Sequence, residues 1–332
     1  GVDVTGPMLG KAKTSAKVEV DFRGSGTTYS LFRIRHVYFN LDWGKSALLV
    51  GQTWHPLYGD VAPEILNLNM GAPYQPFSRA PQIRYRFTSN NFMLTAAAIW
   101  QSQYLSVGPK TNKPGETSTQ KSQEFMKKSC VPEFYLGMDY KRPGLIAGAG
   151  LHVSSITPRT QSETEDAVYF VNERVTGISG EAHVKYAKEN WLVSAKTVLG
   201  TNLTQTSTVG GYGITSIDEV TGKQLYSPLR TSSTWVNVAY GKKWRPALFF
   251  GYLKNLGAAK EVPYGTLGTG TTLDQLFTGT AELTYNIPHW KFGVEYSLCN
   301  AWYGDEFDAK AKAINSHSIL NHRIVLVALF QF

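Results

Sequence analysis

The sequence of 332 residues contains no uninterrupted apolar run of about 18 residues, the length that a membrane-crossing helix requires. The helical class of integral membrane protein is therefore excluded. Only two cysteines are present, Cys130 and Cys299, too few for a disulfide framework, and we expect both thiols to be unpaired. The formal net charge is +8. The basic residues nevertheless form no runs and stand in no nucleic-acid-binding motif, so we expect no nucleic-acid partner.

No grouping of residues in the sequence predicts catalysis, a cofactor or a metal centre. A nucleophile beside a histidine base and its orienting partner does not occur in any recognisable motif. Gly148, Gly150, Gly210 and Gly211 are not followed by the strand-to-helix transition that a phosphate-binding loop needs. We therefore expect a protein that is not an enzyme and holds neither cofactor nor metal.

Aromatic residues and a two-residue alternation of side chains are abundant. The chain has 18 Tyr, 16 Phe and 8 Trp, which suits aromatic girdles at two membrane interfaces. In 82–87 the odd positions are apolar and the even positions are polar, and 280–287 repeats the alternation. Such a period of two predicts β-strands. The segments that we expect to be strands are 1–6, 13–24, 31–43, 46–55, 82–89, 92–102, 133–142, 145–155, 173–188, 191–202, 231–243, 247–257, 277–287, 290–302 and 321–332.

The last segment, 321–332, has the pattern of a strand that faces lipid. One face is wholly apolar and consists of Ile324, Leu326, Ala328, Phe330 and Phe332. A soluble protein that ended on such a strand would present an open apolar edge that invites aggregation. In a transmembrane barrel the strand pairs with the first one and its apolar face meets lipid. We expect this strand to close the barrel.

Short and long connections alternate from residue 44 onward, whereas the link at 25–30 fits less clearly. Tight turns are expected at 44–45, 89–91, 142–144, 189–190, 244–246 and 288–289. Long polar loops are expected near 56–81, 103–132, 156–172, 203–230, 258–276 and 303–320. Outer-membrane barrels have this pattern of short periplasmic turns and long outer loops, and a soluble sandwich has no reason to adopt it.

Residues 1–332 are therefore predicted to form one domain, an all-β transmembrane antiparallel up-and-down barrel. The expected segments number fifteen, whereas bacterial single-chain barrels have an even number of strands. Because the last strand must descend to the periplasm, the first of fifteen segments also descends, so we expect one further upstream strand and a barrel of about sixteen. The number becomes about fourteen if 1–6 is not a strand. Segment 31–43 changes register once, which predicts a β-bulge near Arg35 and His36.

The architecture resembles the general-diffusion porins, and the stretches 32–39 (FRIRHVYF) and 49–54 (LVGQTW) resemble more specifically the DcaP-like trimeric porins. The resemblance implies a Gram-negative bacterial outer-membrane channel and a homotrimer. It also implies that the third outer loop, here 56–81, folds into the lumen and narrows it. The expected partners are small hydrophilic solutes, outer-membrane lipid and lipopolysaccharide.

Charged residues of this loop and of the barrel wall are the candidate site. Acids on an infolded loop that face basic residues on the wall would create a transverse field across the narrow point. The predicted pore-lining residues are Asp60, Glu64 and Arg79 of the loop and Arg33, Arg35, Arg84, Arg86, Lys141 and Lys185 of the wall. Alternatively, the arginines only hold the loop in place. Tyr38, Trp54, Tyr58, Tyr74 and Phe77 are interpreted mainly as packing and girdle residues.

These features favour passive diffusion of small hydrophilic solutes, with anionic or zwitterionic ones preferred because arginine is in excess. A barrel plugged by its loops, acting as an adhesin, assembly partner or structural subunit, remains the alternative. A transporter of hydrophobic substrates would need an apolar lumen. The many inward ionisable residues disfavour it.

Overall fold

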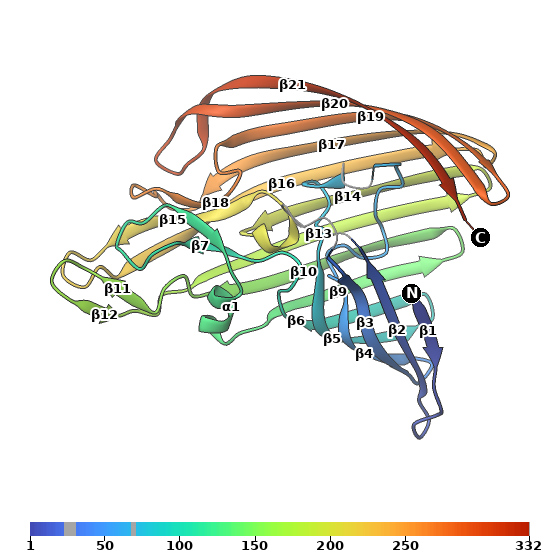
Figure 1. Ribbon diagram of the computed structural model, residues 1–332, viewed down its shortest axis with the longest axis horizontal. Helices are drawn as coiled ribbons and strands as arrows, with labels where there is room; N and C mark the ends of the chain where they lie inside the picture. The colour runs from blue at the N-terminus through green and yellow to red at the C-terminus, as the bar shows by residue number, and fades with distance from the viewer. Residues whose placement is uncertain (23–30, 68–70, 332) are drawn as a thin grey trace.

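Most of the chain forms one antiparallel sheet in which strands that follow each other in sequence lie side by side (Figure 1). The computed structural model describes residues 1–22, 31–67 and 71–331, so the predicted link at 25–30 and Phe332 lie outside the described residues. Of the seventeen strands in the sheet, fifteen form an up-and-down series. They are β1 (Val2–Thr5), β2 (Lys13–Asp21), β3 (Arg33–Asp42), β4 (Ser46–Trp54), β5 (Arg79–Ser89), β6 (Phe92–Ile99), β9 (Glu133–Arg142), β10 (Leu145–Ile156), β13 (Val175–Lys188), β14 (Trp191–Thr201), β16 (Gln224–Tyr240), β17 (Trp244–Ala258), β19 (Leu273–Ile287), β20 (Trp290–Phe307) and β21 (Ala313–Phe330).

The remaining elements lie in the connections between these strands. They are β7 (Val107–Pro109), β8 (Thr119–Lys121), α1 (Glu124–Ser129), β11 (Gln161–Glu163), β12 (Val168–Phe170), the 3₁₀ helix η2 (Thr204–Thr206), β15 (Gly210–Ile217) and β18 (Thr266–Thr269). β15 pairs with β16 and with β18. Helix α1 has six residues, and within the described ranges no helix reaches the length and hydropathy that crossing a membrane demands.

The sheet has an apolar outer face and a largely polar inner face. On β5, Ile83 and Tyr85 are 56% and 44% exposed, whereas Arg84 between them is 7% exposed. On β9 the alternation recurs, with Leu136 at 60% and Tyr135 at 7%. Successive side chains of a strand point to opposite faces. The two-residue period of the sequence therefore sorts apolar from polar side chains, and Arg84 and Arg86 both belong to the inner face.

The predicted β-bulge is confirmed. Along the β2–β3 pair, Glu19 lies opposite His36 and the next residue, Val20, lies opposite Ile34, so that Arg35 has no counterpart. The extra residue restores the alternation, because Ile34 and Val37 are then both exposed on the outer face.

Short turns gather at one end of the sheet, the turn end, and long connections at the other, the loop end. Each of six tight turns contains one residue with positive φ, namely Gly44, Asn90, Gly144, Glu189, Gly241 and His289. Two predicted connections were wrong. The turn expected at 244–246 lies at 241–243, and the long loop expected at 303–320 shrinks to 308–312 because β20 and β21 continue into it.

Aromatic rings on neighbouring strands pack against each other beside the tight turns. The ring centroids are 5.2 Å apart in Phe92–Tyr140, 4.7 Å in Trp191–Tyr240, 4.6 Å in Trp244–Tyr285 and 4.8 Å in Trp290–Phe330. Tyr and Trp favour the headgroup level of a bilayer, where one part of the ring is apolar and the other wet. The row therefore has the composition and position of an interfacial girdle.

The first and last strands are not paired with each other in the part of the chain that the structure describes. Among the described residues, β1 pairs only with β2 and β21 pairs only with β20, so the predicted pairing of the last strand with the first was wrong. The reason is directional. In an antiparallel series of fifteen, the first and the fifteenth strand run the same way, and they cannot form an antiparallel ladder with each other. The expected outward side chains of β21 are confirmed, with Ile324 and Leu326 71% and 78% exposed.

Candidate functional site

The segment between β4 and β5, residues 55–78, reaches the inner face of distant strands. The backbone N–H of Glu64 donates to Asn237 Oδ1 of β16 at 2.8 Å. Two residues later, the N–H of Leu66 donates to Glu282 Oε2 of β19 at 2.7 Å. Because β16 and β19 are far along the series from β4 and β5, the segment extends across the space that the curved sheet encloses. It contains most of the stretch 56–81 predicted as an infolded loop, and 68–70 lie outside the described residues.

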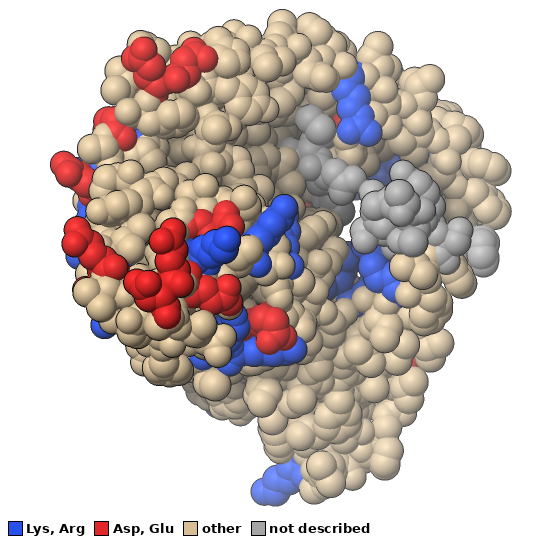
Figure 2. All heavy atoms as spheres, turned by 60° about the vertical axis from the view of Figure 1, so that its left-hand side comes forward, with Lys and Arg blue, Asp and Glu red and all other residues tan. Residues whose placement is uncertain are grey.

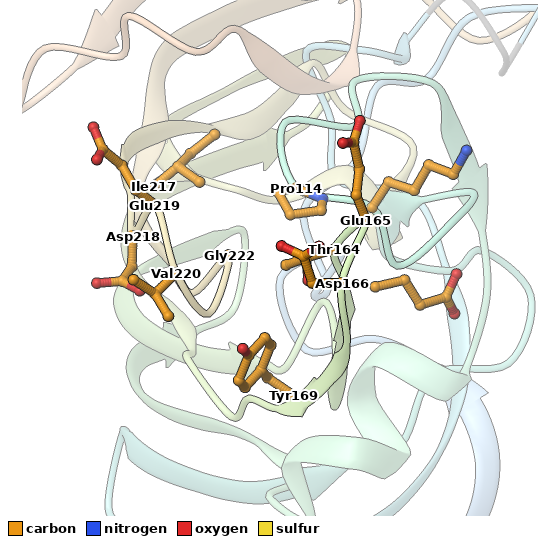
Figure 3. A pocket seen from close by; sticks show the side chains of 12 residues that line it. Pro114, Thr164, Glu165, Asp166, Tyr169, Ile217, Asp218, Glu219, Val220 and Gly222 are labelled. Atoms are coloured by element: carbon orange, nitrogen blue, oxygen red, sulfur yellow. The ribbon is translucent and has the colours of Figure 1, made fainter.

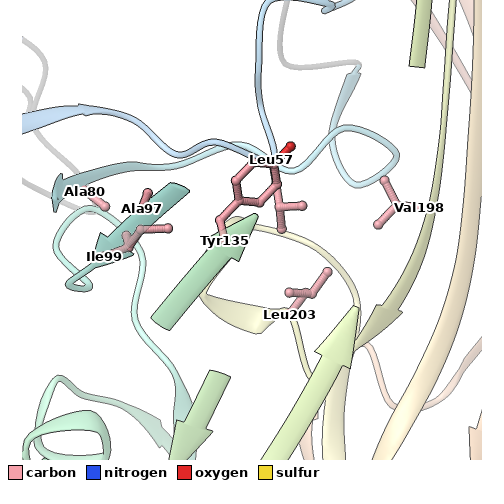
Figure 4. Packing of buried hydrophobic residues seen from close by; sticks show 7 residues of the cluster. All are labelled: Leu57, Ala80, Ala97, Ile99, Tyr135, Val198 and Leu203. Atoms are coloured by element: carbon pink, nitrogen blue, oxygen red, sulfur yellow. The ribbon is translucent and has the colours of Figure 1, made fainter. Parts of the chain in front are cut away.

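The root of this loop is packed and hydrogen-bonded to the wall. Leu57 belongs to a buried cluster with Ala80, Ala97, Ile99, Tyr135, Val198 and Leu203, which come from five different parts of the wall and its connections (Figure 4). The buried ammonium of Lys196 donates to the carbonyl oxygens of Leu57 and Tyr58 at 2.8 and 2.9 Å. These contacts fix the direction in which the chain leaves β4.

Further along the loop, aromatic residues attach it to the opposite wall. Tyr74 packs in a buried cluster with Val61, Trp235 and Phe249. Its hydroxyl lies 2.8 Å from the hydroxyl of Thr278. Trp235 donates from Nε1 to Gln75 Oε1 at 2.8 Å. Of the five aromatic residues considered above, Tyr74 is thus a packing residue.

Asp60 faces a group of wall cations. Its carboxylate accepts a hydrogen bond from Lys141 Nζ, and Arg84 and Arg86 line the same small space. Burial raises the pKa of Asp60. The hydrogen bond and charge of Lys141 and the charges of Arg86 and Arg84 lower it by more, so the pKa of Asp60 lies below its ordinary value. Asp60 is therefore held as a carboxylate opposite the wall.

Glu64 joins two further wall cations. One carboxylate oxygen lies 2.6 Å from Lys185 Nζ and the other lies 3.0 Å from Arg245 Nη2. A cavity of about 530 Å³ adjoins this group at the turn end. Among its lining residues are three cations, Arg245, Lys242 and Lys291. In the described part of the chain, Lys242 and Lys291 have no ion-pair partner.

The structure thus brings Asp60, Arg84, Arg86 and Lys141 together, and Glu64 with Lys185. Arg33 and Arg35 instead pair within their own strand pair: Arg33 Nη2 lies 2.6 Å from Asp21, and Arg35 Nε lies 2.6 Å from Glu19.

Arg79 takes a different position from the rest of the predicted set. It is buried, and its guanidinium lies 3.8 Å from the centre of the Trp54 ring. The ring of Trp54 in turn stacks on Tyr58 at 4.2 Å. Arg79 therefore takes part in a cation–π contact beside the loop root.

Four residues that contact Glu64, Leu66 or Asn67 of the loop were absent from the predicted set: Asn237, Arg245, Glu282 and Glu295. Arg245 was missed because Pro246 indicated a turn, whereas β17 begins at Trp244. Glu282 and Glu295 are inward by alternation, but no spacing reveals that their carboxylates accept the N–H groups of Leu66 and Asn67.

A second cavity, of about 790 Å³, lies among the connections at the loop end. Figure 3 shows it between the tip that joins β15 to β16 and the segments around Pro114 and Thr164. Its acidic lining residues are Glu163, Glu165, Asp166, Asp218 and Glu219, against one cation, Lys113. In Figure 2, acidic side chains also cluster on one side of the loop end. The molecule is hollowed beside this cluster, and Lys and Arg side chains lie around the opening. The entrance therefore carries charges of both signs.

Comparison with solved structures places the chain among porin folds. The outer-membrane channel DcaP of Acinetobacter baumannii is similar over 99% of this chain and 83% of its own, with a TM-score of 0.68 and 18% identity. OmpF of Salmonella typhi is similar over 98% of this chain and 88% of its own, with a TM-score of 0.57 and 14% identity. An anion-selective porin from Comamonas acidovorans is similar over 98% of this chain and 86% of its own, with a TM-score of 0.53 and 10% identity. No protein-family model and no curated protein matches the sequence. At these identities the similarity shows the fold.

Proposed function

We propose that the chain is a bacterial outer-membrane porin through which small hydrophilic solutes, chiefly anionic or zwitterionic ones, diffuse passively. The observation that carries the proposal is the segregation of charge: ionisable side chains cover the inner face and the loop that crosses it, while the outer face is apolar and bordered by aromatic rings. Charges on a lipid face would cost about 2–4 kcal/mol for each Arg or Lys near the midplane. Water on the inner side avoids that cost.

The loop 56–81 is the proposed constriction. Its acids Asp60 and Glu64 form ion pairs with Lys141, Lys185 and Arg245 of the wall. Opposed rows of charge produce a transverse field at a narrow point. Cations exceed acids there, because Arg84, Arg86, Lys242 and Lys291 form no ion pair below 4.0 Å with any described residue. This excess supports a preference for anions.

The barrel is proposed to close with one additional strand between β1 and β21, which gives sixteen. A single strand antiparallel to both would pair with the edges of β1 and β21 that have no strand partner in the described ranges, and uncovered edges are not tolerated in the hydrocarbon region of a membrane. About sixteen strands leave an aqueous channel, whereas eight would pack shut. Outer-membrane lipid and lipopolysaccharide are the proposed surroundings.

A homotrimer is proposed from the shared fold, and the mass of the native assembly in detergent tests it. DcaP is described as an outer-membrane channel and the Comamonas protein as an anion-selective porin. These descriptions apply to those proteins, and their fold similarity supports the proposal made for this chain. The proposed role is passive and includes no catalytic step.

Solute flux into liposomes tests the proposal. Liposomes that contain the purified protein should admit anionic and zwitterionic solutes faster than cationic solutes of matched size. Protein-free liposomes are the control. A barrel plugged by its loop, the alternative role as adhesin or structural subunit, would admit none of them. Faster entry of the cationic solutes would contradict the proposed selectivity.

A further inference from the structure

Three side chains from separate parts of the wall and the loop lie together at the root of the constriction loop. His55 directly follows β4, Glu133 begins β9, and His152 lies on β10. Glu133 Oε2 is 2.8 Å from His152 Nε2 and 3.4 Å from His55 Nε2. All three side chains are at most 2% exposed. Glu133 is 78 residues from His55 and 19 residues from His152 in the sequence. No local sequence motif therefore predicts the group.

The Glu133 carboxylate is buried without a conventional counter-ion. Within the described ranges its only ionic contacts below 4.0 Å are with the two histidines. A buried carboxylate is costly unless it is hydrogen-bonded and its charge is balanced. The imidazoles supply hydrogen bonds to Oε2. A bound divalent cation would compensate the charge of the carboxylate.

We propose that His55, Glu133 and His152 form a transition-metal site, with zinc as the ion that fits best. In a tetrahedral zinc site with bonds of about 2.0–2.1 Å, neighbouring ligand atoms lie about 3.3–3.4 Å apart. Glu133 Oε2 lies 2.8 and 3.4 Å from the two imidazole nitrogens, and all three ligand atoms lie within 4.8 Å of one another. Calcium and magnesium prefer sets composed of oxygen ligands, whereas two imidazoles and one carboxylate suit zinc and its neighbours.

Hydrogen bonds from neighbouring side chains orient the Glu133 carboxylate, as they do for ligands in known metal sites. Gln101 Nε2 donates to Glu133 Oε1 at 2.7 Å, which leaves Oε2 directed at the histidines. Gln101 is itself held, because its Oε1 accepts the N–H of Ser106 at 2.9 Å. Such second partners fix ligand geometry and are a regular feature of protein metal sites.

Metal binding requires a change of tautomer. The N–H of Leu57 lies 3.2 Å from His55 Nδ1, so without metal the His55 proton resides on Nε2 and points at Glu133. When Nε2 binds the ion, this proton moves to Nδ1 and the contact with Leu57 is lost. His152 undergoes the same shift at an Nδ1 that has no hydrogen-bond partner. No proton is released overall, and the cost is the hydrogen bond from Leu57, after which two N–H groups face each other.

The site would tie the first residue of the loop segment to two wall strands. Metal binding there does not depend on whether the barrel conducts. A bound metal would restrain the loop where it leaves β4.

Cobalt titration tests the proposal directly. The protein, purified in detergent without a histidine tag and stripped with a chelator, should bind one equivalent of Co²⁺ with the visible absorption of a tetrahedral site, and zinc should displace it. His152→Gln should weaken binding by more than about 100-fold, because loss of an outer-shell partner alone typically costs about 10–100-fold. His317→Gln is the matched control, since His317 is exposed and pairs with Asp305 far from this group.

Absence of saturable binding to the wild-type protein would overturn the proposal, as would unchanged binding by His152→Gln. If that variant does not fold, X-ray absorption of the zinc-loaded wild type decides. Two imidazole nitrogens and one carboxylate oxygen around the ion support the site. A shell without two imidazoles refutes it.

Discussion

Replacing Glu64 by Gln should make the pore more anion-selective while leaving the barrel intact. The substitution removes one negative charge and frees Lys185 and Arg245, which now contact Glu64 at 2.6 and 3.0 Å. The Glu64 side chain is 42% exposed. Its ion pairs therefore resemble surface pairs, which contribute about 0–1 kcal/mol each to stability.

The effect on permeation follows from Coulomb's law. A unit charge about 6 Å from a permeating ion contributes about 0.7 kcal/mol in water, and screening at 0.1 M salt reduces this to about 0.4 kcal/mol. Anions and cations respond in opposite directions. The ratio of anion to cation permeability should therefore rise by about three- to fourfold.

Reversal potentials in a KCl gradient measure this ratio. Glu124→Gln is the matched control, because Glu124 also pairs with a lysine, Lys127, but on the short helix α1 at the loop end. The control should shift the ratio far less. An unchanged reversal potential for Glu64→Gln, or an equal shift in both variants, would refute the placement of Glu64 at the narrow point.

Three further predictions concern the same loop and wall. Arg86→Gln should shift the reversal potential in the direction opposite to Glu64→Gln and by a similar factor, and a shift of the same sign would contradict the role of the wall cations. Trp235→Ala should lower the free energy of unfolding in urea by about 3–5 kcal/mol, because Trp235 is wholly buried against the loop. Trp191→Ala, at an exposed turn-end ring, should cost much less. The pKa of Asp60 lies below its ordinary value of 3.8, so its contribution to stability is fully present above that value and is lost as the pH falls through the lower, folded-state pKa. The Asp60-dependent selectivity should follow the same course, and Asp60→Asn should abolish this acid step.

Much of the fold follows from local chemistry in the sequence. A strand exposes alternate side chains to opposite sides, so the apolar and polar positions of 82–87 and 133–141 predict the two faces that Ile83 and Arg84 occupy. The change of register of the apolar positions near Arg35 likewise predicted the bulge. These features depend on neighbours along the chain, which a sequence displays directly.

The site depends on contacts between distant residues, and there the sequence was less informative. Pro246 favoured a turn, yet it lies inside β17, and the misplaced turn concealed Arg245 as a partner of Glu64. The sequence also could not show that Arg33 is paired with Asp21 on the adjacent strand. Alternation predicts which face a charge occupies. Which charge it meets depends on the path of the loop.

We propose that the enclosed space is an open, water-filled path, biased by wall cations that have no ion-pair partner among the described residues. Single-channel recording of the wild-type protein in a planar bilayer, under a KCl gradient, tests it most directly. Ohmic current steps with a reversal potential on the anion-selective side are predicted. Absence of steps, or a reversal potential on the cation-selective side, would contradict the account.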